Sequence, residues 1–213
     1  MRLTRRELMH AAAVAGTALL PALPLLGSAA EQCAGVTLLL DGDDYLARES
    51  AAGYKRALRG MGDARTIIVP AISTLSLACA TALRAKVQAG RSVILESALT
   101  FTDDTSTEQQ CRIIRDLFGF PVEWPQEQAG GAASYIQYRW PVDALVRSFG
   151  QPVYIRNDNQ RAIAHHPANR IVAARKSMGD GEVVFLGSPL GPLLLAEDRE
   201  ATLLVRRMIA ECV

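Results

Sequence analysis

The sequence of 213 residues contains few of the residue types that usually perform catalysis at neutral pH. It has three histidines, four cysteines and 6% aromatic residues. It has no glycine-rich phosphate loop, no dinucleotide-binding fingerprint and no Cys/His spacing that is typical of a metal site. The 23 basic and 22 acidic residues nearly balance, so no basic stripe indicates nucleic-acid binding. We therefore expect no cofactor, no metal and no nucleic-acid partner.

The sequence has one long apolar stretch, at its N-terminus. The paired arginines Arg5 and Arg6 precede an Ala-rich apolar run from residue 11 to residue 26, and small residues follow at positions 28–30. This pattern is typical of a twin-arginine export signal, which a receptor reads as an address. An ordinary secretory signal and an uncleaved anchor are the alternatives.

Two prolines, Pro21 and Pro24, interrupt this run, which is barely long enough to span a bilayer. We therefore expect no stable membrane insertion once the signal is removed. The sequence predicts an export signal at residues 1–30, one domain at residues 31–213 and a periplasmic location.

The four cysteines are an even number in a chain that we expect in an oxidising compartment. Cys33 and Cys212 lie at the two ends of the predicted domain, and chain ends are often close together. This placement favours a disulfide between them. Cys79 and Cys111 fall within helical patterns, where a buried free thiol is typical.

Short apolar runs alternate with helical periods in the first half of the predicted domain. Buried strands are predicted at residues 36–41, 66–70 and 92–96, and helices follow each of them. Continuous apolar strands separated by helices indicate a parallel sheet that is covered on both faces. The sequence thus predicts an α/β fold with a doubly wound, mostly parallel sheet sandwiched by helices in a single domain.

The second half is less regular. We expect a loop at residues 121–134, then a strand-like run at 135–141 that leads into a short helix. Short strands are expected at 152–155, 171–175 and 182–186, and a final helix at 198–211. His165 and His166 are adjacent, and we expect them in an exposed turn between two strands, with a role as base or ligand as the alternative.

The segment from Met178 to Pro192 combines a Gly-x-Gly turn, an apolar strand and a Gly-Ser-Pro corner before the terminal helix. It resembles the class I glutamine amidotransferase-like superfamily, and most closely its non-catalytic branch with trehalose-utilisation-type and uncharacterised domains. The resemblance covers most of residues 36–212 and implies a flavodoxin-like, amidotransferase-like sheet.

Active members of that superfamily carry a cysteine on a glycine-flanked elbow after the third strand, and a histidine and glutamate after the last strand. The thiol needs an oriented base in order to become a nucleophile. Here Glu96 and Ser97 stand at the elbow without glycines, and Ser188-Pro189-Leu190 follows the last strand. The sequence therefore predicts that the amidotransferase reaction is lost.

Polar residues follow the predicted parallel strands, and the carboxyl ends of such strands are where ligands bind. The candidates for a ligand-binding cleft are Asp41, Asp43, Asp44, Ser73, Glu96, Ser97 and Ser188. Asp43 or Asp44 is instead expected to cap the first helix. The pair Asp41 and Asp43 also resembles the first motif of haloacid-dehalogenase-type phosphatases, so the alternative is a divalent-metal-dependent hydrolase that uses Asp41, Asp43 and Glu96.

The aromatic residues of the irregular middle are Trp124, Tyr135, Tyr138 and Trp140. They form either a surface for a sugar or a protein, or a cover for the edge of the sheet. The sequence as a whole favours an exported, non-catalytic domain that binds a small polar ligand or an envelope protein. A structural partner subunit is the remaining alternative.

Overall fold

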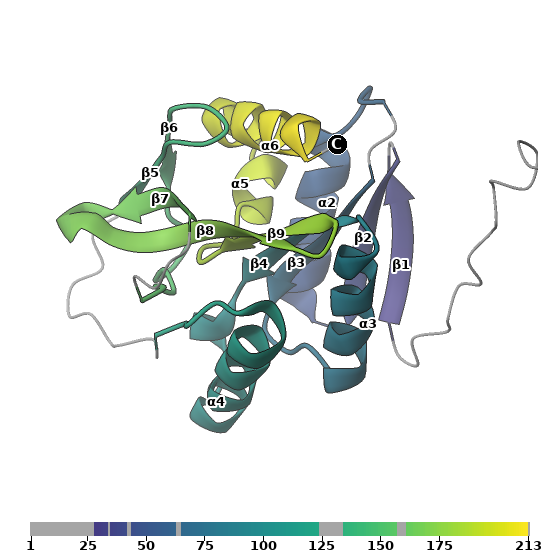
Figure 1. Ribbon diagram of the computed structural model, residues 1–213. Helices are drawn as coiled ribbons and strands as arrows, with labels where there is room; N and C mark the ends of the chain where they lie inside the picture. The colour runs from purple at the N-terminus through teal and green to yellow at the C-terminus, as the bar shows by residue number, and fades with distance from the viewer. Residues whose placement is uncertain are drawn as a thin grey trace, which may run out of the picture.

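The computed structural model describes residues 28–33, 35–41, 44–62, 65–123, 134–156 and 161–212. Three sequence features lie outside these ranges: most of the predicted export signal with its paired arginines, Asp43, and Trp124. The described residues form one mixed sheet with helices on both faces (Figure 1).

The sheet contains nine strands in the described ranges, in the order β1-β2-β3-β4-β9-β8-β7-β5-β6. Their bounds are β1 Ser28–Cys33, β2 Val36–Asp41, β3 Thr66–Ile72, β4 Ser92–Ser97, β5 Tyr135–Tyr138, β6 Ala144–Arg147, β7 Arg161–His166, β8 Arg170–Met178 and β9 Gly181–Leu186.

The prediction of a doubly wound, mostly parallel, flavodoxin-like sheet is wrong. Only the pairs β2–β3, β3–β4 and β4–β9 are parallel, and the other five neighbouring pairs are antiparallel. The antiparallel strands come mainly from the second half of the chain, where tight turns replace helical crossovers. Strands β5 and β6 alternate buried and exposed residues, which is typical of antiparallel strands with one open face.

Helices cover the two faces of the sheet in separate groups. Helices α2 (Tyr45–Ala57), α5 (Gly191–Leu195) and α6 (Arg199–Glu211) lie above the sheet in Figure 1, and α3 (Leu77–Gln88) and α4 (Asp104–Ile113) lie below it. A five-residue π-helix, η2 (Ile114–Phe118), continues α4, and single 3-10 turns form η1 (Leu99–Phe101) and η3 (Pro167–Asn169).

Side-chain oxygens cap the N-termini of the four longer helices, where backbone N–H groups lack partners within the helix. The capping residues are Asp44, Ser76, Asp103 and Asp198.

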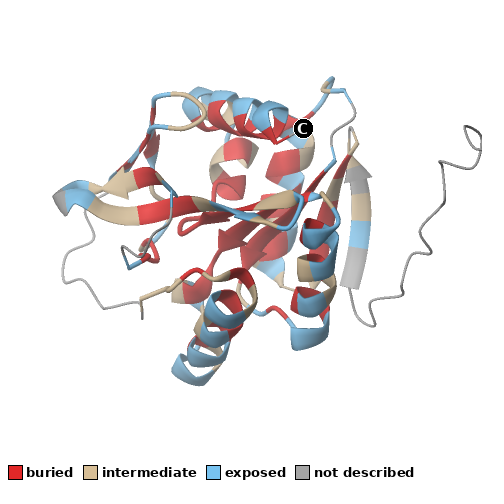
Figure 2. Ribbon diagram, in the orientation of Figure 1, coloured by how far each residue is buried: buried red, intermediate tan, exposed pale blue. Residues whose placement is uncertain are grey.

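Two hydrophobic clusters hold these layers together. Alternate residues of each central strand point to opposite faces, so Leu38 and Ile68 join the cluster under α2 and α6, while Leu39 and Ile67 join the cluster over α3 and α4. The buried residues of both clusters follow the sheet in Figure 2. Central strands that are buried on both faces explain the continuous apolar runs in the sequence.

Three expectations for the chain after residue 134 need correction. The segment after Trp140 forms strand β6, not a short helix. Residues 161–166 form strand β7, so His165 and His166 end a strand and do not lie in a turn. Of residues 152–155, only Ile155 pairs, in isolated bridges to Val122 and Ile171.

The predicted disulfide between Cys33 and Cys212 is absent, because neither residue takes part in a disulfide. Cys33 lies on the outermost strand, β1, where its thiol contacts the Lys55 carbonyl oxygen at 3.7 Å. The carbonyl oxygen of Cys212 accepts a hydrogen bond of 2.7 Å from Ser92 at the start of β4. Strands β2 and β3 lie between β1 and β4. Cys33 on β1 and Cys212 beside β4 therefore lie at different parts of the sheet.

Residues 28–30, which the sequence assigns to the end of the export signal, form the first half of β1. Their pairing with β2 runs from Ser28 opposite Asp41 to Ala30 opposite Leu39. The predicted boundary between signal and domain therefore falls inside a strand.

Candidate functional site

Glu96, the elbow residue of the sequence comparison, is fully buried at the end of β4. Its carboxylate accepts hydrogen bonds from the Tyr54 hydroxyl at 2.9 Å and from the Ser50 hydroxyl, both on α2. It also accepts from three backbone N–H groups: those of Ala71 at 2.8 Å, Leu190 and Gly191 at 2.9 Å. Five donors from three separate segments thus converge on one side chain.

Local backbone geometry brings these donors into place. The β3–β4 register shifts between Val69 and Ile72, and Ala71 has a φ of 42°, in the left-handed region that non-glycine residues rarely adopt. This shape turns the Ala71 N–H toward Glu96. On the other side, a Cβ atom at Gly191 would overlap Ser50, so only glycine allows the start of α5 to approach α2 this closely.

Burial raises the pKa of Glu96, and the hydrogen bonds from Ser50, Gly191, Leu190 and Tyr54 oppose that rise. A carboxylate offers about four lone-pair sites. The five donors occupy them, so no oxygen of Glu96 is free to bind a cation or a substrate. Glu96 joins α2, β3 and α5, which is a structural role.

The predicted strand-end residues near the first helix form local hydrogen bonds. Asp44 accepts from the Leu46 N–H at 2.8 Å and from the Ser73 hydroxyl, which confirms that it caps α2. Asp41 accepts from the Ser76 N–H at 2.7 Å and so steadies the start of α3. These three predicted residues, Asp41, Asp44 and Ser73, connect neighbouring loops at the carboxyl ends of β2 and β3.

The two remaining predicted serines are almost fully buried. The Ser97 hydroxyl accepts a 3.4 Å hydrogen bond from the Leu99 N–H. The Ser188 hydroxyl accepts from the Phe149 N–H at 3.1 Å and donates to the Phe149 carbonyl oxygen at 3.4 Å. Within the described ranges, no three His, Cys, Asp or Glu side chains gather as metal ligands would.

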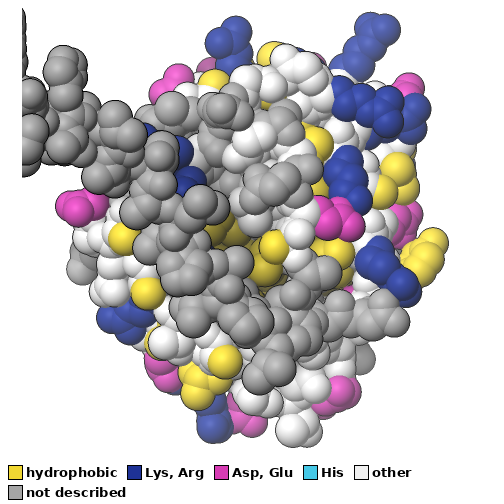
Figure 3. Space-filling view, turned by 90° about the vertical axis from the view of Figure 1, so that its right-hand side faces the viewer, with side chains coloured by type: hydrophobic (Ala, Val, Ile, Leu, Met, Phe, Trp, Pro, Cys, Tyr) yellow, Lys and Arg dark blue, Asp and Glu magenta, His cyan; other side chains and the backbone are white. Residues whose placement is uncertain are grey.

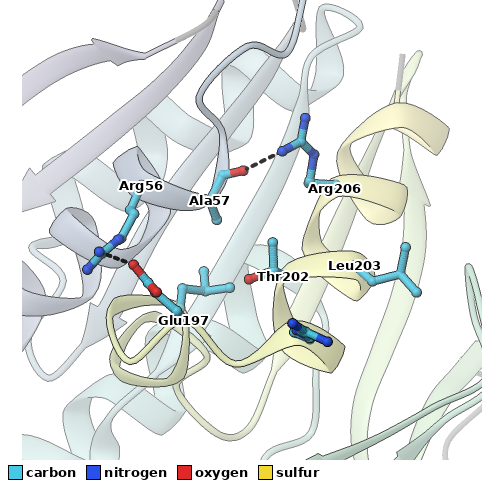
Figure 4. A pocket seen from close by; sticks show the side chains of 8 residues that line it. Arg56, Ala57, Glu197, Thr202, Leu203 and Arg206 are labelled. Carbon is cyan, nitrogen blue, oxygen red and sulfur yellow. Dashed lines mark hydrogen bonds and ion pairs between the residues drawn. The ribbon is translucent and has the colours of Figure 1, made fainter.

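One hollow lies between the end of α2 and the start of α6 (Figure 4). It has a volume of about 430 Å³ and is lined by three arginines, Arg56, Arg199 and Arg206. Arg56 forms an ion pair with Glu197, and Arg206 donates to the Ala57 carbonyl oxygen at 3.3 Å. Two of the three arginines therefore already serve the contact between α2 and the α5–α6 segment.

A second hollow of about 300 Å³ lies where β7 and β8 meet the segment around residues 154–156. The guanidinium of Arg170 is stacked 3.4 Å from the ring centroid of Tyr154 and forms an ion pair of 2.7 Å with Glu123. Arg156 and His165 line the same hollow. We call this the Arg170 pocket, and it is defined by Glu123, Tyr154, Arg156, His165 and Arg170.

The neighbouring His166 supports the wall of the Arg170 pocket. Its Nδ1 atom lies 3.0 Å from the Tyr154 hydroxyl, and its buried Nε2 atom has no hydrogen-bond partner among the described residues. Burial lowers the pKa of His166, and the nearby Arg170 lowers it further. Both effects disfavour the charged form of His166, whose ring packs against the Tyr154 ring on which Arg170 is stacked.

The sequence left two roles open for the aromatic residues of the middle segment: a binding surface, or a cover for the edge of the sheet. Tyr138 is fully buried, and Trp140 packs against the core with the Arg175 guanidinium 4.5 Å from its ring centroid. Tyr135 remains 50% exposed. Two of the three described aromatic residues therefore cover the sheet, and one faces outward.

Sequence reasoning missed the Arg170 pocket because its residues come from three separate segments. The candidates predicted from the sequence lie at the ends of the parallel strands, whereas Arg156 and Arg170 belong to the antiparallel half of the sheet. The usable signal was the spacing of His165, His166 and Arg170 across a tight turn, which brings basic side chains of two neighbouring strands together.

No known protein family matches the sequence, and no curated protein matches it either. Solved structures do resemble it. They include an exo-β-1,4-mannosidase from Opitutaceae bacterium strain TAV5, with 15% identity and a TM-score of 0.55 over 76% of this chain and 31% of that chain. The β-galactosidase from Rahnella sp. R3 has 13% identity and a TM-score of 0.54 over 76% of this chain and 26% of that one.

A cytoplasmic protein from Salmonella typhimurium LT2 is similar over nearly its whole length, with 9% identity and a TM-score of 0.54 over 87% of this chain and 94% of that chain. By contrast, this chain spans 26% to 31% of the first glycosidases that it matches. At these identities the likeness concerns the fold alone.

Charges of both signs are mixed on one face of the molecule. On the face shown in Figure 3, the described Lys and Arg side chains alternate with Asp and Glu. In the part of the chain that the structure describes, no helix has the length and apolar character needed to cross a membrane.

Proposed function

We propose that this protein is an exported, non-catalytic binding protein that holds a small oxyanion in the Arg170 pocket. The observation that carries the proposal is the fixed guanidinium of Arg170, which is stacked on Tyr154 and paired with Glu123. A guanidinium that is already oriented loses little conformational freedom when it binds an anion.

Two further groups beside Arg170 are available to a ligand. The Arg156 side chain is exposed, and neither it nor His165 has a side-chain hydrogen bond or ion pair to any described residue. Arg156 and Arg170 together exceed the single negative charge of Glu123. The pocket therefore favours an anion.

The planar fork of a guanidinium matches the geometry of carboxylate, phosphate and sulfate groups. The volume of about 300 Å³ suits a small molecule. Glu123, at the same pocket, accepts hydrogen bonds and so favours ligand hydroxyl groups next to the anionic group. The expected ligand class is a small hydroxylated acid or phosphate ester.

The alternative of a metal-dependent hydrolase finds no support in the strand-end carboxylates. All lone-pair sites of Glu96 are taken by internal donors. Asp44 caps α2, and Asp41 accepts from the N–H of Ser76, the residue that caps α3. The glycosidase neighbours share only the fold with this chain, so they add no argument for sugar hydrolysis.

Isothermal titration with phosphate, sulfate and citrate tests the proposal. The wild-type protein should bind at least one of them, and Arg156→Gln should weaken that binding about 10-fold or more, as expected for the loss of one charge-assisted hydrogen bond worth at least about 1.4 kcal/mol. Arg170→Gln should have at least as large an effect.

The matched control is Arg199→Gln, which removes an exposed arginine from the other hollow and should leave the affinity unchanged. Because Arg156 is exposed, its substitution should leave the fold intact. Equal affinities for wild type and Arg156→Gln, or an equal loss in Arg199→Gln, would refute the assignment of the pocket.

A further inference from the structure

Strand β6 forms one edge of the sheet. It pairs with β5 on one side, and no strand of the described ranges lies on its other side (Figure 1). The free N–H and C=O groups of an edge strand are a template for pairing with another chain.

The backbone register shows which groups of β6 are free. The Ser148 N–H donates to the Ser134 carbonyl oxygen at 2.8 Å, next to the pairs Tyr135–Arg147 and Ile136–Val146. Hydrogen-bonded pairs alternate along an antiparallel ladder, so Val146 and Ala144 bond to β5. The N–H and C=O groups of Leu145 and Arg147 therefore point away from the sheet.

The side chains of the same residues are also exposed. Leu145 is 58% exposed, and its opposite neighbours on that face are Gln137 and, diagonally, Tyr135, which is 50% exposed. Asp143 and Arg147 flank Leu145 two residues away on either side, and both are exposed. Neither charge has a partner among the described residues.

The charges on β6 are arranged so that two copies of the strand can pair with opposite charges facing each other. If two β6 strands pair antiparallel about Leu145, Asp143 of each copy stands opposite Arg147 of the other. Opposite charges directly across a strand pair stabilise it, whereas like charges destabilise it. The exposed residue at the centre of β6 is a leucine and not a charged residue of the kind that protects many edge strands.

We propose that a second copy of this chain pairs with β6, so that the two sheets continue through a two-fold axis at Leu145. The contact is isologous, because the same residues meet on both sides. Each copy contributes one strand of four residues, so we expect a weak dimer with a dissociation constant between about 1 μM and about 1 mM. The contact does not involve the Arg170 pocket.

Sedimentation equilibrium over a range of concentrations tests this dimer. The wild-type protein should dimerise reversibly, and Arg147→Asp should weaken the dimer about 10-fold or more by placing like charges opposite each other. The double variant Asp143→Arg/Arg147→Asp restores opposite charges and should regain most of the wild-type affinity.

The matched control is Arg161→Asp, the same substitution on β7, which is paired on both sides. It should leave the dimer unchanged, and thermal melts of all variants should confirm that they are folded. A protein that stays monomeric up to about 1 mM, or a dimer that is insensitive to Arg147→Asp, would overturn the proposal. Failure of the double variant to recover would do the same.

Discussion

Glu96 is the residue on which the largest number of described side-chain and backbone donors converge. The sequence places it at the end of the third parallel strand among candidates for ligand binding. The structure places it there too, but surrounds it with two hydroxyl groups and three backbone N–H groups. Those donors belong to segments up to 95 residues away, and strand periodicity cannot show them.

Replacement of this carboxylate should be costly. In Glu96→Gln an NH₂ group, which is a donor, replaces one carboxylate oxygen. It would face at least two groups that are themselves donors, so at least two buried hydrogen bonds are lost. We expect the free energy of unfolding to fall by roughly 3–5 kcal/mol, as for other disrupted buried charges. Urea unfolding of the wild type and the variant measures this loss.

Glu108→Gln is the matched control, because Glu108 is exposed and pairs only with Arg112 one helical turn away. Its expected effect is below about 0.5 kcal/mol. A small effect of both substitutions would show that Glu96 does not join α2, β3 and α5.

At the scale of elements, the contact between α2 and α5 depends on two glycines. A Cβ atom at Gly53 would overlap the Gly191 carbonyl oxygen, and one at Gly191 would overlap Ser50. The two helices therefore touch through their backbones. This contact also keeps the N–H groups of Leu190 and Gly191 beside Glu96.

Gly53→Ala should consequently destabilise the protein, although alanine is the better helix former by about 1 kcal/mol. Overlap with the α5 backbone should lower the free energy of unfolding by roughly 1–3 kcal/mol net. Thermal and urea unfolding will show the sign of the change. Gly62→Ala, where an added Cβ atom meets nothing within 4 Å, should be neutral within about 0.5 kcal/mol.

The elements with strong periodicity were predictable from the sequence. Strands β2, β3, β4 and β9 match the predicted apolar runs, and α6 begins at Arg199 after its predicted cap region. Strands β5 and β6 have four residues each, too few for a pattern to separate them from a loop or a short helix. Strand β7 was missed because its paired histidines and following proline resemble a turn.

At the scale of the whole molecule, β9 joins two kinds of sheet. It is parallel to β4 on one side and antiparallel to β8 on the other. The sequence revealed the parallel part because βαβ spacing repeats along the chain. It did not reveal the antiparallel part, whose strand order depends on long-range pairing such as that of β5 with both β6 and β7.

The pairing of β1 leads to a prediction about the N-terminal boundary. A chain that begins at Glu31 lacks the pairs Ser28–Asp41, Ala29–Leu40 and Ala30–Leu39, which a chain that begins at Ser28 retains. The shorter chain should be less stable by about 1–2 kcal/mol, since each net hydrogen bond contributes about 0.5–1.5 kcal/mol. Chemical unfolding of the two purified chains compares them, and equal stabilities would show that this half of β1 contributes nothing.

The Arg170 pocket is a property of the whole fold, because residues from positions 123 to 170 meet only when β7 and β8 pair beside the 154–156 segment. Short-range patterns predicted His165 in an exposed turn, with a role as base or ligand only as the alternative. The described candidates for the predicted strand-end cleft make internal hydrogen bonds.

The position of a bound oxyanion in crystals grown with phosphate tests this account most directly. We predict phosphate density against the guanidinium groups of Arg156 and Arg170, within reach of His165. Phosphate held instead between Arg56 and Arg206, with the Arg170 pocket empty, would contradict the account.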